Sequence, residues 1–272
     1  MTRAEWHQVI SRWRLRQGGK LQCRIDQMIR PALYAGLFGE GYTRYVAGLQ
    51  HHLGGQTDTA ELASLANITT RDHVLDVCCF IGGPALQLAD TFQCHVTGID
   101  MAPNCIAAAS RIAELAGLAH LATFRVADAA NLPFDDQTFS VVWCQGSIEH
   151  YTAWLREFDR VLVNGGRIAI TFEIGNNDRT THDYRWGLTD VSQFIESLGY
   201  WVEHADDITC RDIEIGWKAL DRQLLERERE FIWLLGSEWV HQAHAKFKEA
   251  IAEMQRGEWG NGRIVARKSA KI

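Results

Sequence analysis

The stretch His73-Val-Leu-Asp-Val-Cys-Cys-Phe-Ile-Gly-Gly-Pro-Ala85 decides the fold. Its first five residues form a short apolar run that ends at a turn, which is typical of a buried strand. Pro84 then opens a helical pattern through Asp90. The same change from strand to helix recurs along the chain, and such alternation predicts a parallel sheet with helices on both faces.

Working outward, the hydrophobic periodicity predicts an α/β chain with seven strands, mostly parallel. The expected strands are 73–77, 95–99, 122–126, 139–144, 167–172, 200–204 and 262–268. The expected helices include 84–90, 103–117, 154–162, 189–198 and one from Thr57, as its cap, to Ala66. Residues 1–70 are predicted to form an N-terminal helical cap or lid. Residues 71–272 form the main domain, with a helical insertion at about 210–257 that completes the cap.

Composition limits the classes of function. The chain has 272 residues, of which 46% are hydrophobic, and a formal net charge of −6. The acidic balance disfavours nucleic acid as a partner. The chain has neither a secretory signal nor an apolar run of ~18 residues, so we expect no membrane partner. An odd number of cysteines, 7, without a CxxC pair indicates reduced thiols in the cytoplasm, and we expect no metal site. A homodimer is left open.

Acidic residues follow three successive expected strands. Asp76 ends the first, Asp100 the second, and Asp128 lies just past the third. In a doubly wound sheet, ligands bind beyond the carboxyl ends of the strands, near the point where strand order reverses. A carboxylate after the second strand can accept both hydroxyls of a ribose. Each aspartate alone could be a helix cap or turn residue, but the three together predict a nucleoside-containing ligand at this edge.

Several segments together resemble the small-molecule class I methyltransferases that depend on S-adenosylmethionine (SAM), in particular the glycine/sarcosine–dimethylglycine and tocopherol-like group. The segments are 54–59, 74–85, 96–100, 131–145, 160–167 and 207–209, followed by Trp217. The resemblance covers roughly 34–268 and implies a Rossmann-like sheet, SAM as cofactor with S-adenosylhomocysteine as product, and a small-molecule methyl acceptor. It assigns cofactor binding to Asp76, Cys78, Phe80, Gly82, Gly83, Asp100, Met101, Asn104, Asp128, Ala129 and Gln145. A nicotinamide enzyme is the alternative, but Cys78 to Ile81 would crowd a pyrophosphate.

The loop departs from the family pattern at two positions. Cys78 and Phe80 stand where the resembled family has glycine. We expect ordinary backbone angles at both, with Phe80 packing on SAM or lining the pocket. Positive φ would instead bring strain and would favour altered cofactor use, such as a modified SAM, or a non-catalytic binding protein that retains the fold.

Candidate residues for the chemistry follow the fourth strand. Methyl transfer mainly requires alignment of the nucleophile, and a hydroxyl acceptor also needs a base. His150 and Glu149 are the candidate bases, although His150 could equally be a helix-start residue. Aromatic faces attract cations, so some rings could line the acceptor pocket, while most are expected to pack in the core. The preferred pocket residues are Tyr34, Tyr42, Tyr151, Tyr184 and Trp217. The predicted function is methyl transfer from SAM to an amine or hydroxyl of a metabolite.

Overall fold

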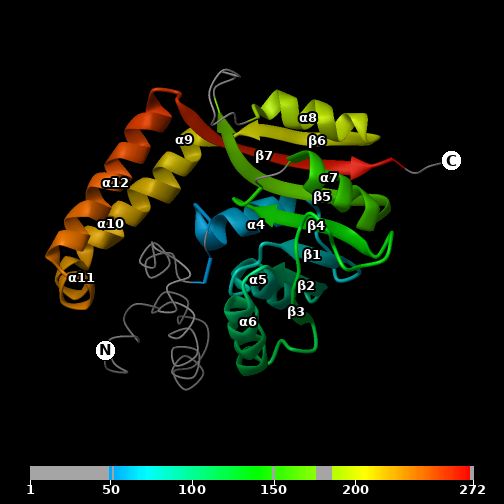
Figure 1. Ribbon diagram of the computed structural model, residues 1–272, viewed down its shortest axis with the longest axis horizontal. Coiled ribbons are helices and arrows are strands. Elements are labelled where there is room, and N and C mark those ends of the chain that lie inside the picture. The colour runs from blue at the N-terminus through cyan, green and yellow to red at the C-terminus, as the bar shows by residue number, and fades with distance from the viewer. Residues whose placement is uncertain (1–48, 51, 149–150, 176–185, 270–272) are drawn as a thin grey trace.

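A computed structural model describes residues 49–50, 52–148, 151–175 and 186–269 (Figure 1). Seven strands form one sheet in the order β3-β2-β1-β4-β5-β7-β6. β7 runs antiparallel to both β5 and β6, and the pairs among the other strands are parallel. The strands are β1 (His73–Val77), β2 (His95–Asp100), β3 (Ala122–Val126), β4 (Phe139–Gln145), β5 (Leu162–Gly175), β6 (Tyr200–Asp207) and β7 (Trp259–Lys268). The predicted seven-stranded, mostly parallel Rossmann-like sheet is confirmed.

Helices follow most strands, as βαβ connections require. They are α4 (Gly55–Leu65), α5 (Gly83–Phe92), α6 (Pro103–Ala116), α7 (Tyr151–Val161) and α8 (Leu188–Ser197). The start predicted for the first of these at Thr57 is wrong. That helix begins at Gly55, because Gly54 adopts a left-handed conformation (φ 79°) that turns the chain into it.

A helical arm separates β6 from β7 and projects away from the sheet (Figure 1). It consists of α9 (Thr209–Asp212), a π-helical turn (Ile213–Trp217), α10 (Lys218–Glu226), α11 (Glu228–Leu235) and α12 (Ser237–Gln255). α10 and α12 lie side by side along its length. Within the described residues, every helix is too short or too polar to cross a membrane.

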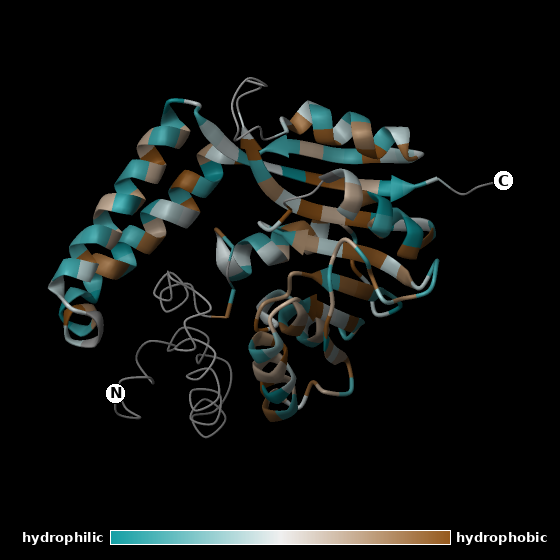
Figure 2. Cartoon of the chain, viewed as in Figure 1, coloured by the Kyte–Doolittle hydropathy of each residue, from teal (hydrophilic) through white to brown (hydrophobic). Residues whose placement is uncertain are grey.

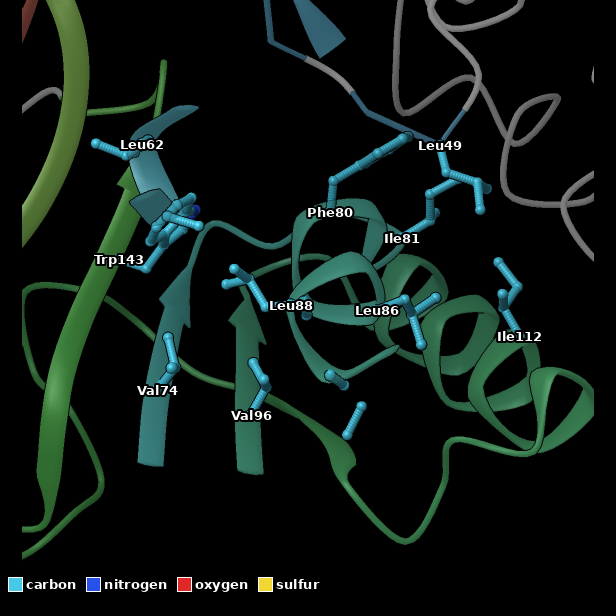
Figure 3. Packing of buried hydrophobic residues seen from close by; sticks show 14 of the residues in the cluster. Leu49, Leu62, Val74, Phe80, Ile81, Leu86, Leu88, Val96, Ile112 and Trp143 are labelled. Carbon is cyan, nitrogen blue, oxygen red and sulfur yellow. The ribbon is translucent and has the colours of Figure 1, made fainter. Parts of the chain in front are cut away.

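The core lies on both faces of the sheet. Val74 belongs to a cluster beneath α4, α5 and α6, whereas its neighbour Leu75 belongs to a second cluster beneath α7 and α8. In β4, Val141 likewise belongs to the first cluster and Val142 to the second, because successive side chains of a strand point to opposite faces. Apolar residues accordingly run along the central strands in Figure 2, and Figure 3 shows the first cluster in detail. Burial on both faces explains why these strands read as continuous apolar runs.

The segment before α4 crosses closely over the start of α5. A Cβ built on Gly83 would lie 2.2 Å from the carbonyl oxygen of Leu49, so only glycine fits there. Leu49 lies near Ile81 and Phe80 in the first cluster (Figure 3). This crossing brings the residues after Leu49 to the carboxyl edge of the sheet, next to the loop that follows β1.

Candidate active site

Strand register brings the predicted acids to one edge. Asp76 pairs with Gly98 of β2, and Asp100 pairs with Val126, the last residue of β3. Asp100 accepts hydrogen bonds from the backbone N–H groups of Phe80 (3.0 Å) and Ala102 (2.9 Å). A carboxylate has about four acceptor positions, so Asp100 retains capacity for the hydroxyls of a ribose. It therefore holds the loop after β1 while remaining a candidate ligand-binding group.

Asp128 and its neighbours form the far end of this edge. The Asp128 carboxylate accepts a hydrogen bond from the N–H of Ala130 at 2.8 Å, which fixes the turn after β3. Ala129 is buried, and Asn104 at the start of α6 is exposed. Two large apolar side chains are unusually exposed beside Asp100: Met101 at 69% and Val126 at 48%. Apolar surface flanking a carboxylate suits a flat base attached to a ribose.

Asp76 is the most perturbed acid of the edge. It is 2% exposed, and its Oδ2 atom has no hydrogen-bond partner among the described residues. Burial raises the pKa of Asp76 to about 8, and the nearby negative charge of Asp100 also raises it. A hydrogen bond from the backbone of Ala85 lowers this pKa, but by less than burial raises it. A buried carboxyl with one unpartnered oxygen fits a cationic group such as the amino group of SAM, which would supply the missing interaction.

The loop after β1 has left-handed backbone at both residues that replace glycine. Cys78 has φ 59° and Phe80 has φ 52°, so the expectation of ordinary angles is wrong. The loop geometry needs these angles because β1 must turn sharply into α5, whatever side chains the sequence supplies. Phe80 is 7% exposed and packs in the first cluster near Leu49 (Figure 3). Cys78 packs against the second cluster, on the opposite face.

Replacing Cys78 with glycine should stabilise the protein. Left-handed backbone costs a non-glycine residue ~1–3 kcal/mol, and glycine removes this strain. Part of the resulting stabilisation is lost, because glycine increases the backbone entropy of the unfolded state. We expect Cys78→Gly to raise the free energy of unfolding in urea by about 0.5–1 kcal/mol. Asn67→Gly is the matched control, because Asn67 also has positive φ (50°) but asparagine tolerates it. A Cys78→Gly protein less stable than wild type would mean that the thiol contacts outweigh the strain.

Gln145, at the end of β4, lies in a buried polar network. Its Oε1 accepts hydrogen bonds from Nε1 of Trp143 (2.9 Å) and from the hydroxyl of Thr59 (3.0 Å). Its Nε2 donates to Oδ2 of Asp58 at 2.7 Å. Three partners hold the amide in one orientation. The structure thus connects Gln145 first to α4, and any contact with a cofactor or acceptor remains a prediction.

The same network continues to the arm. Arg211 of α9 pairs with Asp58 at 2.9 Å and with Glu61 at 2.7 Å. Asp212 accepts a hydrogen bond from Asn261 of β7 at 2.7 Å, and burial raises its pKa to about 6. Ion pairs between α9 and α4 therefore attach the arm to the carboxyl edge of the sheet.

The remaining predicted residues are placed in part. Tyr34, Tyr42, Glu149, His150 and Tyr184 lie outside the described residues, and of Tyr151 only the backbone is described. Trp217 ends the π-helical turn at the base of the arm. Its ring contacts Phe247 and Trp259 (centroids 5.6 and 6.5 Å apart). Its Nε1 is buried without a hydrogen-bond partner among the described residues. A π-turn often marks a functional site.

Sequence reasoning missed His52, Asp58, Thr59 and Arg211. Their place beside the carboxyl edge depends on the crossing at Gly83 and on pairing between residues far apart in the chain. The nearest signal in the sequence was the resemblance of residues 54–59, which adjoin His52. Within the part of the chain that the structure describes, there is no group of three or more His, Cys, Asp or Glu side chains placed to hold a metal ion.

Comparison with known proteins defines the class. Residues 74–166 match a family model described as a methyltransferase domain. With the sheet order, this match identifies a methyltransferase-type Rossmann-like domain over these residues.

Particular relatives are more distant. The chain is 27% identical to phosphoethanolamine N-methyltransferase 3 of Arabidopsis thaliana, over 87% of this chain and 49% of the relative. It is 33% identical to the chloroplastic tocopherol O-methyltransferase of the same plant, over 54% of this chain and 40% of the relative. A structure of Haemonchus contortus phosphoethanolamine N-methyltransferase 2 in complex with SAM superposes with a TM-score of 0.77 at 17% identity, covering 89% of this chain and 60% of that one. The chain thus spans about half the length of the curated relatives it matches.

Proposed function

We propose that this chain transfers the methyl group of SAM to a nitrogen or oxygen of a small metabolite. The observation that carries the proposal is Asp76, a buried carboxyl whose Oδ2 has no hydrogen-bond partner among the described residues, at the same sheet edge as Asp100. Asp76 would hold the amino group of SAM, Asp100 the ribose hydroxyls, and Asp128 with Ala129 the adenine. When bound, SAM supplies an activated methyl group on sulfur. The protein then has to orient the acceptor and exclude water.

Binding of the cofactor is tested by calorimetric titration with SAM and with S-adenosylhomocysteine. We expect micromolar affinity for both, and at least a tenfold loss in Asp100→Ala, because the ribose hydroxyls lose a charged acceptor. Asp90→Ala is the matched control, since Asp90 is an exposed acid on α5. Absence of measurable binding to either ligand would refute the proposal.

The acceptor is tested by release of S-adenosylhomocysteine. The panel contains phosphoethanolamine, sarcosine, dimethylglycine and a tocopherol, chosen after the relatives and the family resemblance. Turnover identifies the acceptor compound, and the NMR spectrum of the product identifies the atom that is methylated. His150 and Glu149, as candidate bases just after β4, remain a prediction that this assay would test.

The strained loop favours a second candidate, a fold-retaining protein that binds SAM without transferring its methyl group. Left-handed backbone at Cys78 and Phe80 is the observation behind it. Binding of SAM without methyl transfer to any protic small molecule would support this candidate over the first. A Cys78→Gly protein that gained turnover would show that the loop limits catalysis.

A further inference from the structure

His52 lies beside the end of β4, at the carboxyl edge of the sheet, where ligands bind in doubly wound folds. Gly146 is the first residue after this strand, and a Cβ built on it would be 3.5 Å from Cβ of His52. The His52 side chain is 5% exposed, so bulk water has little access to it. The residues after Leu49 thus place a shielded imidazole at this edge, beside the residue that follows β4.

The orientation of the Gln50 amide next to His52 is fixed by a chain of hydrogen bonds through Gln87. Nε2 of Gln87 donates to the backbone carbonyl of Gln56 at 2.9 Å, and a carbonyl can only accept. Oε1 of Gln87 therefore faces Nε2 of Gln50, at 2.6 Å. This leaves Oε1 of Gln50, an acceptor, directed at the imidazole. Flipping the Gln50 amide would set two oxygens against each other at Gln87.

Both ring nitrogens of His52 consequently face acceptors. Nε2 is 2.8 Å from Oε1 of Gln50. Nδ1 is 3.1 Å from the carbonyl oxygen of Leu53 and 3.5 Å from Oδ2 of Asp58. A neutral imidazole carries one N–H, so it donates a hydrogen bond to the acceptors at one ring nitrogen only. At the other nitrogen, a lone pair faces the oxygen atoms and no hydrogen bond forms. The hydroxyl of Thr59, 3.1 Å from Nε2, has one hydrogen and also lies within reach of Gln50 and Gln145. A second proton on the ring would let both nitrogens donate hydrogen bonds to the acceptors that face them.

The charges around His52 oppose each other. Burial lowers the pKa of His52, and the cation of Arg211 on α9 lowers it further, whereas Asp58 on α4 and the Leu53 carbonyl raise it. The imidazole is therefore neutral at rest in surroundings whose hydrogen-bonding geometry matches its protonated form. That combination describes a group that accepts a proton when one is delivered next to it.

We propose that His52, supported by Asp58, receives the proton released when the acceptor is methylated. This inference rests on the proposed function. The acceptor lone pair forms the new bond to the methyl carbon, and the carbon–sulfur bond breaks with its electron pair remaining on sulfur, which gives S-adenosylhomocysteine. The proton of the acceptor N–H or O–H moves to the unprotonated ring nitrogen of His52. His52 then returns it to solvent before the next turnover.

The kinetic test uses His52→Gln in the full chain with a panel compound that supports turnover and carries an N–H or O–H on the methylated atom, which excludes the tertiary amine dimethylglycine. We expect kcat to fall by ~10²-fold while the SAM dissociation constant changes less than about twofold. The acidic limb of the kcat/KM profile should disappear with the imidazole. His120→Gln, an exposed histidine after α6, is the matched control and should behave as wild type. Normal kcat with an unchanged pH profile in His52→Gln would overturn the proposal, as would an equal loss of SAM affinity.

A second test needs no acceptor, so it separates this inference from the choice of substrate. Ring ¹⁵N signals of His52 in the S-adenosylhomocysteine complex are assigned by their loss in His52→Gln and followed against pH. We expect His52 to titrate below the ordinary imidazole pKa of 6.5 in wild type and lower still in Asp58→Asn, because the supporting negative charge is gone. If His52 titrates at the ordinary value, or if Asp58→Asn leaves its titration unchanged, the proposal fails even when SAM binding and methyl transfer are intact.

Discussion

The Asp76→Asn variant should be more stable than wild type in alkaline solution and should bind SAM poorly. Ionised Asp76 is a buried charge, and its pKa of about 8 means that folding opposes its ionisation. Asparagine has the same shape and no charge. The variant keeps a neutral polar group in the pocket but cannot neutralise a cationic amino group. Stability and cofactor affinity therefore change in opposite directions.

The pH dependence has a definite sign. The unfolded carboxyl loses its proton near its ordinary pKa of 3.8, whereas the folded one keeps it until about pH 8. Between these values the native state binds more protons than the unfolded state, so stability falls as pH rises. From pH 5 to pH 8 wild type should lose ~4 kcal/mol relative to Asp76→Asn, at ~1.4 kcal/mol for each pH unit. Urea unfolding across this range measures the difference.

Cofactor binding should show the complementary trend. Because SAM needs the ionised carboxylate, wild type must release a proton on binding near pH 7, and its affinity should rise toward pH 8. Asp90→Asn, at an exposed acid, is the control and should leave both curves unchanged. A constant stability difference between Asp76→Asn and wild type across the pH range would mean that Asp76 is already ionised in the unliganded protein.

Central strands were predictable from the sequence because they are buried on both faces. Val74 and Leu75 read as one apolar run, and the structure places β1 over the predicted residues 73–77. β5 was harder to delimit. It was expected at 167–172 and spans Leu162–Gly175. Leu162 pairs with Phe139 of β4 at its start, and β7 pairs with polar residues at its end, such as Glu173 with Asn261. Backbone pairing of that kind leaves no hydrophobic pattern.

The grouping of the three predicted acids was predictable, because it follows from where the strands end. Asp76, Asp100 and Asp128 lie at one edge because parallel strands share their carboxyl ends. The backbone angles of Cys78 and Phe80 were not predictable, since the turn imposes them against the preference of the side chains. The contacts of His52 depend on tertiary packing and have no local pattern to reveal them.

Arg211→Gln should be the most destabilising single change at the base of the arm. Arg211 is the cation that faces Asp58, a carboxylate only 2% exposed, and it also contacts Asp212 at 3.1 Å. Removing one partner of a buried pair leaves an uncompensated charge, which costs ~3–5 kcal/mol. We expect a loss of about 3 kcal/mol in the free energy of unfolding, measured in urea at pH 7.5, where Asp212 is also ionised in view of its pKa of about 6.

Two further variants test whether the stability lost in Arg211→Gln comes from the buried, unpaired charge of Asp58. Glu61 binds the same guanidinium at 2.7 Å, but its side chain is 45% exposed, so Glu61→Gln should cost less than ~1 kcal/mol. The double variant Asp58→Asn/Arg211→Gln should be more stable than Arg211→Gln alone, because it removes the stranded charge together with its partner. Similar losses for Arg211→Gln and Glu61→Gln would show that solvent reaches Asp58. In that case the arm would be attached to the sheet by packing, and its charges would contribute little.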